Sequence, residues 1–155
     1  MARLDMLRPY VEKVVAEYLG IPPDKKLVVN DDGSIPIHVG SAMYYVQLME
    51  GEPAILQVYS VMIEELDKSP ELFEALNEIN RTTYYAKVFW LDDHRVVAAS
   101  EIVADTADKG EIGNACNAIA WVADHYDTEL QKKFGGKMSF TDEAPAKPED
   151  APADV

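Results

Sequence analysis

Residues 69–80, SPELFEALNEIN, carry the most complete helix signal in the chain. Ser69 offers a capping hydroxyl, Pro70 suits the first helical position, and Glu71 places a negative charge at the positive end of the helix dipole. The apolar residues that follow recur at helical spacing and are Leu72, Phe73, Leu76 and Ile79. The stretch predicts an amphipathic helix from about Pro70 to Arg81 that packs one side against a neighbouring layer.

A β hairpin is predicted directly after this helix. Residues 84–91 and 95–103 are rich in aromatic and β-branched side chains, which favour strands. Asp92-Asp93-His94 lies between the two segments and supplies the polar residues of a turn. We therefore expect strand, turn and strand in this region.

The last predicted helix is marked at both ends. Asp108 at the cap position and Glu111 three residues later have the spacing of a capping box. Apolar side chains then recur at helical spacing until Gly135-Gly136 provides a stop signal. The pattern predicts a helix from about Lys109 to Lys133.

Two longer strands are expected upstream of residue 69. The segments from Ala42 to Met49 and from Ala54 to Ile63 are apolar and rich in β-forming residues. Glu50-Gly51-Glu52-Pro53 separates them and has strong turn chemistry. The two segments should form an antiparallel pair.

A further hairpin is predicted before these strands. Leu27-Val28-Val29 and residues 35–39 flank residues 30–34, whose Asp-Gly pair favours the positive φ angles of a tight turn. Pro36 has no backbone N–H, which restricts its segment to a sheet edge or a strand start. We expect three or four strands before residue 69.

These elements predict an α+β fold in which three helices pack on an antiparallel sheet of about five strands, in the order α-β-β-β-α-β-β-α. The first helix begins near Pro9 and ends before Gly20. We assign residues 1–136 to one domain. Residues 137–155 have three prolines, five acids and few large apolar side chains, so they predict a disordered acidic tail rich in proline and alanine.

The charge of the chain argues against several classes of partner. Its 155 residues include 28 acidic and 14 basic side chains, for a formal net charge of −14, which repels phosphate backbones and anionic lipids. We therefore expect no nucleic acid and no membrane partner. The N-terminus lacks a secretory signal and the chain has one cysteine, so a cytoplasmic location is expected.

The sequence has no recognisable catalytic or metal-binding pattern. His38, His94 and His125 have no Cys or His partner at metal-ligand spacing. Phosphate-binding glycine loops and the Gly-x-Ser-x-Gly elbow are missing. Adjacent carboxylates such as Glu64-Glu65 are expected by chance among 28 acids. We predict no catalytic residue, no metal and no cofactor.

Aromatic residues in the predicted strands are the candidates for a binding surface. Tyrosine and tryptophan on a sheet face give a peptide a large contact area at a small loss of rotamer freedom. Core packing under the helices is the alternative explanation for the same rings. The positions that we single out for peptide binding are Tyr44, Tyr59, Tyr85 and Trp90.

Residues 72–136 resemble a known family. The run LFEALNEIN, the hairpin and a last helix that closes on Phe134-Gly135-Gly136 resemble the bacterial YbjN-like family, whose fold is similar to that of the small acidic chaperones of type III secretion. Asn77 and Asn80 are the most specific part of the likeness. Asn80 lies near a helix end, where an amide can hydrogen-bond the start of the next strand, so its expected role is structural.

The resemblance implies a three-stranded meander between the first two helices, polypeptide binding without catalysis, and often a homodimer. Three functions remain open from the sequence. The first is a peptide-binding chaperone or adaptor with a protein or peptide client. The second is an acidic regulatory protein that holds a basic partner, and the third is an unrecognised enzyme, for which convergent acids in a pocket would be the sign.

Overall fold

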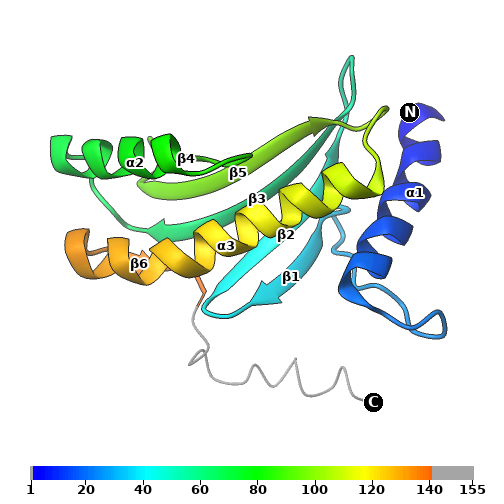
Figure 1. The fold of residues 1–155 in the computed structure, drawn as a ribbon, viewed down its shortest axis with the longest axis horizontal. Helices are drawn as coiled ribbons and strands as arrows, with labels where there is room; N and C mark the ends of the chain where they lie inside the picture. Colours follow the sequence, from blue (N-terminus) through cyan, green and yellow to red (C-terminus); the bar gives the residue numbers. More distant parts are fainter. Residues whose placement is uncertain (1, 141–155) are drawn as a thin grey trace.

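The structure is a computed structural model that describes residues 2–140 (Figure 1). Helices and strands follow one another in the predicted order, and a short strand comes after the last helix. The elements are α1 Ala2–Leu19, β1 Ile35–Val39, β2 Ala42–Met49, β3 Ile55–Glu64, α2 Pro70–Thr82, β4 Lys87–Leu91, β5 Arg95–Val103, α3 Lys109–Phe134 and β6 Lys137–Met138. The predicted α+β class is confirmed.

Antiparallel pairing joins the strands into one sheet with the order β1-β2-β3-β5-β4. Tyr45 of β2 lies opposite Tyr59 of β3, and Tyr59 in turn lies opposite Ala99 of β5. Strand β1, which contains Pro36, forms one edge of the sheet, as its proline predicts. Strand β4 forms the other edge, so β5 is an interior strand.

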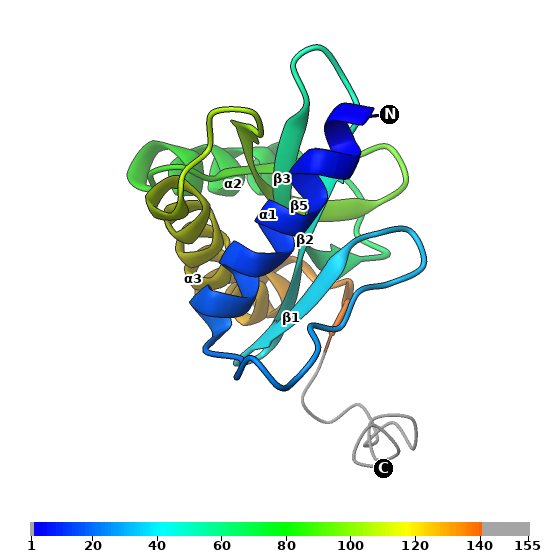
Figure 2. The same cartoon turned by 90° about the vertical axis from the view of Figure 1, so that its right-hand side faces the viewer.

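All three helices lie on one side of the sheet (Figures 1 and 2). Helix α3 runs across β2, β3 and β5, α2 packs against β4, and α1 contacts α3. The strand residues on this side include Ala42, Tyr44, Val46, Leu56, Val58, Val96 and Ala98, all of which are buried. They form one core with buried residues of α3 such as Ile112, Ile119 and Val122.

The predicted strand at Leu27-Val28-Val29 is wrong. The structure has no strand between α1 and β1, and the side chain of Val28 is 65% exposed. The Asp-Gly turn does form, but it lies in the loop before β1, where the Asn30 N–H donates to the Ser34 carbonyl over 2.8 Å. Asp32 also accepts from the Ser34 N–H, so the turn residues 30–34 bond among themselves without a strand at residues 27–29.

The first two residues of the predicted tail form a strand. Lys137 and Met138 form β6, which pairs with Ile63 and Glu64 at the end of β3. Gly136 has a φ of +77°, and a Cβ there would lie 2.6 Å from Ile63 Cγ2, so a glycine is needed where the chain turns back to the sheet. Residues 141–155, the rest of the predicted tail, lie outside the described residues.

The turn between β1 and β2 is tied to α3 by a buried carboxylate. Asp127 of α3 is 2% exposed, and both of its oxygens accept from the Ser41 hydroxyl, over 2.9 and 3.1 Å. Burial raises the pKa of this carboxyl above its usual value. Asp124, one turn earlier, accepts from the Ser41 N–H over 2.8 Å, so two side chains of α3 hold the edge hairpin in place.

Asn80 joins the end of α2 to the edge strand β4. Its side-chain amide donates to the Val88 carbonyl over 2.9 Å, and its carbonyl accepts from the Val88 N–H over 2.7 Å. These two bonds reproduce what a neighbouring strand would supply to Val88. The structural role predicted for Asn80 is confirmed.

We predict that Asn80→Ala lowers the free energy of unfolding by about 1–3 kcal/mol, because it leaves two backbone groups of Val88 without partners. Denaturation in urea measures the change. Asn77→Ala is the matched control, since Asn77 is exposed on the same helix, and its effect should stay within about 0.5 kcal/mol. Equal losses in both variants would contradict the role of the two Asn80 bonds.

Candidate peptide-binding surfaces

The structure separates the four aromatic residues that the sequence singled out. Tyr44 lies in the core under the helices, and Tyr59 lies on the opposite side of the sheet. Tyr85 lies in the loop between α2 and β4, and Trp90 is half-buried beside α2. The four residues therefore do not form one surface.

Tyr44 is a core residue, which corrects its place among the binding candidates. Its side chain is 2% exposed and points to the same side of β2 as Ala42 and Val46. Burial also raises the pKa of its phenol. A peptide could reach this ring only if the domain opened.

Trp90 ties three segments together on the helix side of the sheet. Its indole N–H donates to the Leu66 carbonyl over 2.7 Å, which links β4 to the loop before α2. The ring packs edge-on against Phe73 of α2 and against His94 of the β4–β5 turn. These contacts give Trp90 a structural role between the three segments.

Tyr59 belongs to the side of the sheet that no helix among residues 2–140 covers; we call this surface the open sheet face. Its ring stacks on Tyr45 of the neighbouring strand, with 5.3 Å between ring centroids. Burial raises the pKa of both phenols, and the nearby Asp32 carboxylate adds to the effect. Other residues of this face are Met43, Gln47, Gln57, Val61, Phe89, Leu91 and Val97.

Charged and polar side chains border the apolar centre of the open sheet face. Glu101 accepts from Lys87 over 2.7 Å and from Gln57 over 3.0 Å. Arg95 pairs with Asp93 in the adjoining turn, over 2.7 Å. An apolar centre with a polar rim is the usual anatomy of a protein interface.

Tyr85 belongs to a second surface, which runs along α3 beside α2 and the loop after it. Two hollows of about 590 and 700 Å³ adjoin at Thr82, and together we call them the α2–α3 groove. One half is lined by Glu71, Glu74, Asn77, Glu78, Tyr126, Glu129, Leu130 and Lys133. The other half is lined by Thr83, Tyr84, Tyr85, Asn114, Asn117, Trp121 and Asp124.

The loop at the groove explains why β4 begins at Lys87 rather than at Tyr84. Tyr85 has a φ of +62°, which is rare for an aromatic residue and incompatible with a strand. The rings of Tyr84 and Tyr85 consequently project from the domain, with Tyr84 82% exposed.

Among residues 2–140, no group of three or more His, Cys, Asp or Glu side chains is placed to hold a metal ion. Burial raises the pKa of the Cys116 thiol to about 11, so this side chain carries little thiolate at neutral pH. Within the same range, no helix has the length and apolar character that crossing a bilayer requires.

Comparison with known proteins places the chain in a family. Residues 5–142 match the family described as "T3SS (YopN, CesT) and YbjN peptide-binding chaperone 1". The chain belongs to this family of peptide-binding chaperones, so the predicted resemblance to YbjN-like proteins is confirmed. No protein with a curated description matches the sequence.

Two solved structures share the fold at low sequence identity. A chain in the crystal structure of the ExsC–ExsE complex is 13% identical, with a TM-score of 0.59, and the match covers 79% of this chain and 94% of that one. A chain in the HopA1–SchA chaperone–effector complex is 10% identical, with a TM-score of 0.53, and the match covers 84% of this chain and 96% of that one.

Sequence reasoning missed two of the rings that shape these surfaces. Tyr45 shares its side of β2 with Gln47, and Tyr59 shares its side of β3 with Gln57, so these glutamines mark the side that faces solvent. That alternation could have favoured Tyr45 over Tyr44. Trp121 left a signal too, because it lies outside the helical stripe of apolar positions that includes Ile119 and Val122, where a tryptophan is exposed.

We predict that Tyr44→Ala lowers the free energy of unfolding by about 3–5 kcal/mol, because it leaves a cavity in the core. Tyr84→Ala removes the same side chain from an exposed position and should change stability by less than about 0.5 kcal/mol. Thermal or urea denaturation of the two variants makes the comparison. Similar values for both would contradict the burial of Tyr44.

Proposed function

We propose that this protein is a non-enzymatic chaperone or adaptor that takes up a segment of a client protein on the open sheet face. Membership of a peptide-binding chaperone family supports the class of function. The stacked Tyr45–Tyr59 pair on an uncovered sheet face is the observation that carries the choice of surface.

The physical basis is apolar contact with a pre-organised surface. Strand pairing fixes the backbone under Tyr45 and Tyr59, so their rings lose little freedom when a client binds. Val61, Val97 and Phe89 lie in the neighbouring row of the same face and extend its apolar area beyond this pair. The tyrosine hydroxyls can still hydrogen-bond, which suits a surface that accepts varied peptide sequences.

The structural neighbours support the same proposal. One was solved as a complex of ExsC with ExsE and the other as a chaperone–effector complex. By analogy, the client of this protein is a polypeptide. We also place the protein in the cytoplasm. A net charge of −14 disfavours nucleic acid and anionic membranes as partners, so we propose neither.

We predict that Tyr59→Ala weakens client binding by about 1–2 kcal/mol, or roughly five- to thirtyfold in Kd, because the ring lies at the centre of the proposed surface. The probe is an array of short immobilised synthetic peptides that vary in apolar, aromatic and basic content. A peptide that retains the labelled protein is then titrated by fluorescence anisotropy.

Met6→Ala is the control, since it removes an exposed apolar side chain of α1 that lies on neither the open sheet face nor the α2–α3 groove. Circular dichroism of each variant checks that the fold is kept. If no peptide in the array retains the protein, or if both variants bind as tightly as the wild type, the proposal is wrong.

We also propose a homodimer, as the family resemblance implies. Light scattering at micromolar concentration should give about twice the chain mass of 17.3 kDa. If the measured mass stays at that of one chain up to the highest concentration reached, the dimer proposal is wrong. The binding proposal does not depend on it.

A further inference from the structure

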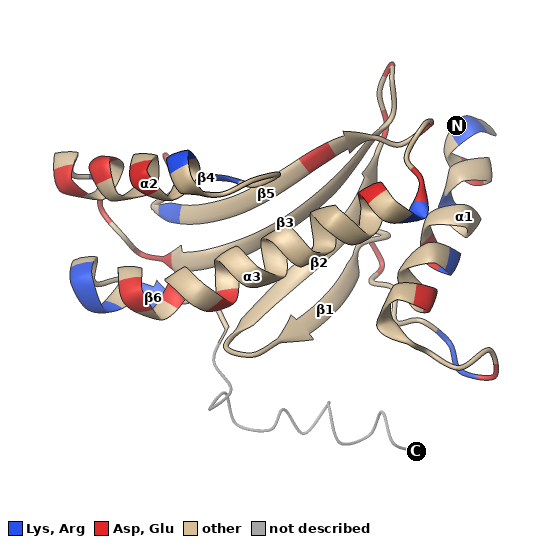
Figure 3. Ribbon diagram, viewed as in Figure 1, with Lys and Arg blue, Asp and Glu red and all other residues tan. Residues whose placement is uncertain are grey.

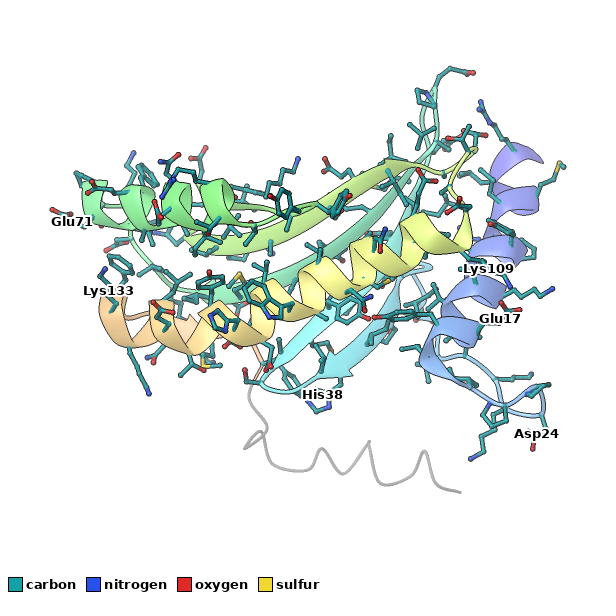
Figure 4. The ribbon with its side chains drawn as sticks, in the orientation of Figure 1. Glu17, Asp24, His38, Glu71, Lys109 and Lys133 are labelled. Atoms are coloured by element: carbon teal, nitrogen blue, oxygen red, sulfur yellow. The ribbon has the colours of Figure 1, made fainter. Side chains whose placement is uncertain are left out.

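The α2–α3 groove lies on the helix side of the molecule and differs in character from the open sheet face. Helix α2 and the end of α3 run beside each other, with Glu71 and Lys133 at the same end of the pair (Figure 4). The groove continues past Thr82 to exposed aromatic side chains. One end of it is therefore acidic and the other aromatic.

Acidic residues outnumber basic ones along α2, at the acidic end of the groove (Figure 3). Four glutamates and one lysine line it. Glu78 is paired with Arg81 over 2.7 Å, whereas no described residue forms an ion pair with the other three, Glu71, Glu74 and Glu129. An uncharged occupant would remove water from these carboxylates and offer no charge or hydrogen bond in its place, which costs free energy. A stable occupant therefore brings positive charge to this end.

The aromatic end presents rings that are exposed and yet held in place. Trp121 is 54% exposed, and its ring stacks on His125 one helical turn later with 4.7 Å between centroids. Tyr85 projects from a backbone with φ +62°, a conformation that an aromatic residue seldom adopts. Large, exposed, fixed rings are the side chains that most often anchor a bound partner.

We propose that the α2–α3 groove is a docking site for a segment of a second protein that carries two or three Lys or Arg side chains at one end and a large apolar side chain at the other. The basic end would lie against Glu71, Glu74 and Glu129, and the apolar side chain against Trp121. Helix α2 has 13 residues and is about 20 Å long, so the segment needs about six extended residues or about 13 helical ones to follow it.

Charge argues against the two occupants that the chain itself could supply. A symmetric pair of copies that met at this groove would bring the unpaired glutamates of both copies into one interface and would add no net positive charge to it. The segment 141–155 carries five acidic side chains and one lysine, so it would add negative charge to the groove. A basic segment of another protein is the occupant that charge complementarity favours.

The test uses a fluorescent synthetic peptide with three lysines followed by two leucines and a phenylalanine. Neutralising the groove with Glu71→Gln, Glu74→Gln and Glu129→Gln together should weaken binding by about tenfold at low salt, because three exposed attractions are lost. The matched control is Asp5→Asn, Asp24→Asn and Asp31→Asn, which removes the same charge from exposed sites outside the groove and should change Kd by less than about twofold.

Two further variants locate the peptide. Trp121→Ala should weaken binding by about fivefold or more, whereas Tyr59→Ala on the open sheet face should leave it unchanged. Equal losses in the two triple variants would mean that the peptide responds only to net charge, and the proposal would be wrong. If only Tyr59→Ala weakens binding, the peptide binds the open sheet face and the groove proposal is wrong. No binding at all, together with a tighter dimer in the glutamate variant, would assign the groove to a second copy.

Discussion

The packing of α3 across β2, β3 and β5 is the contact on which the rest of the structure depends. It buries one side of three neighbouring strands, and the other two helices add to the same side. Among the described residues, no element is left to cover the opposite side. The open sheet face is therefore a consequence of how this chain distributes its helices, and a surface of that kind suits a protein that binds polypeptides.

Side-chain bonds hold both edges of the sheet to the helices. At one edge, Asp124 and Asp127 of α3 accept from Ser41 in the β1–β2 turn. At the other edge, Asn80 of α2 pairs with both backbone groups of Val88 in β4. Because each edge strand is anchored to a helix, the sheet between them presents its rings from a fixed backbone.

Local signals in the sequence predicted the parts of the fold that depend on neighbours in the chain. The Ser69 and Asp108 caps form as expected, and the strand segments around Gly51 pair as expected. Tertiary context decided the rest. β6 exists because Gly135 and Gly136 return the chain to β3. The choice between Tyr44 and Tyr45 depended on which side of β2 meets α3, and the polar Gln47 and Gln57 on the side of Tyr45 are the sequence signal for it.

The charge of the molecule and its exposed rings are best understood together. A protein that leaves an aromatic sheet face uncovered is prone to associate with itself, and a net charge of −14 opposes that association by repulsion between copies. The same charge favours partners in which basic side chains accompany apolar ones, because these supply both attractions at once. Apolar contact would then set how long a partner stays, while charge would set how fast it arrives and which partners are rejected.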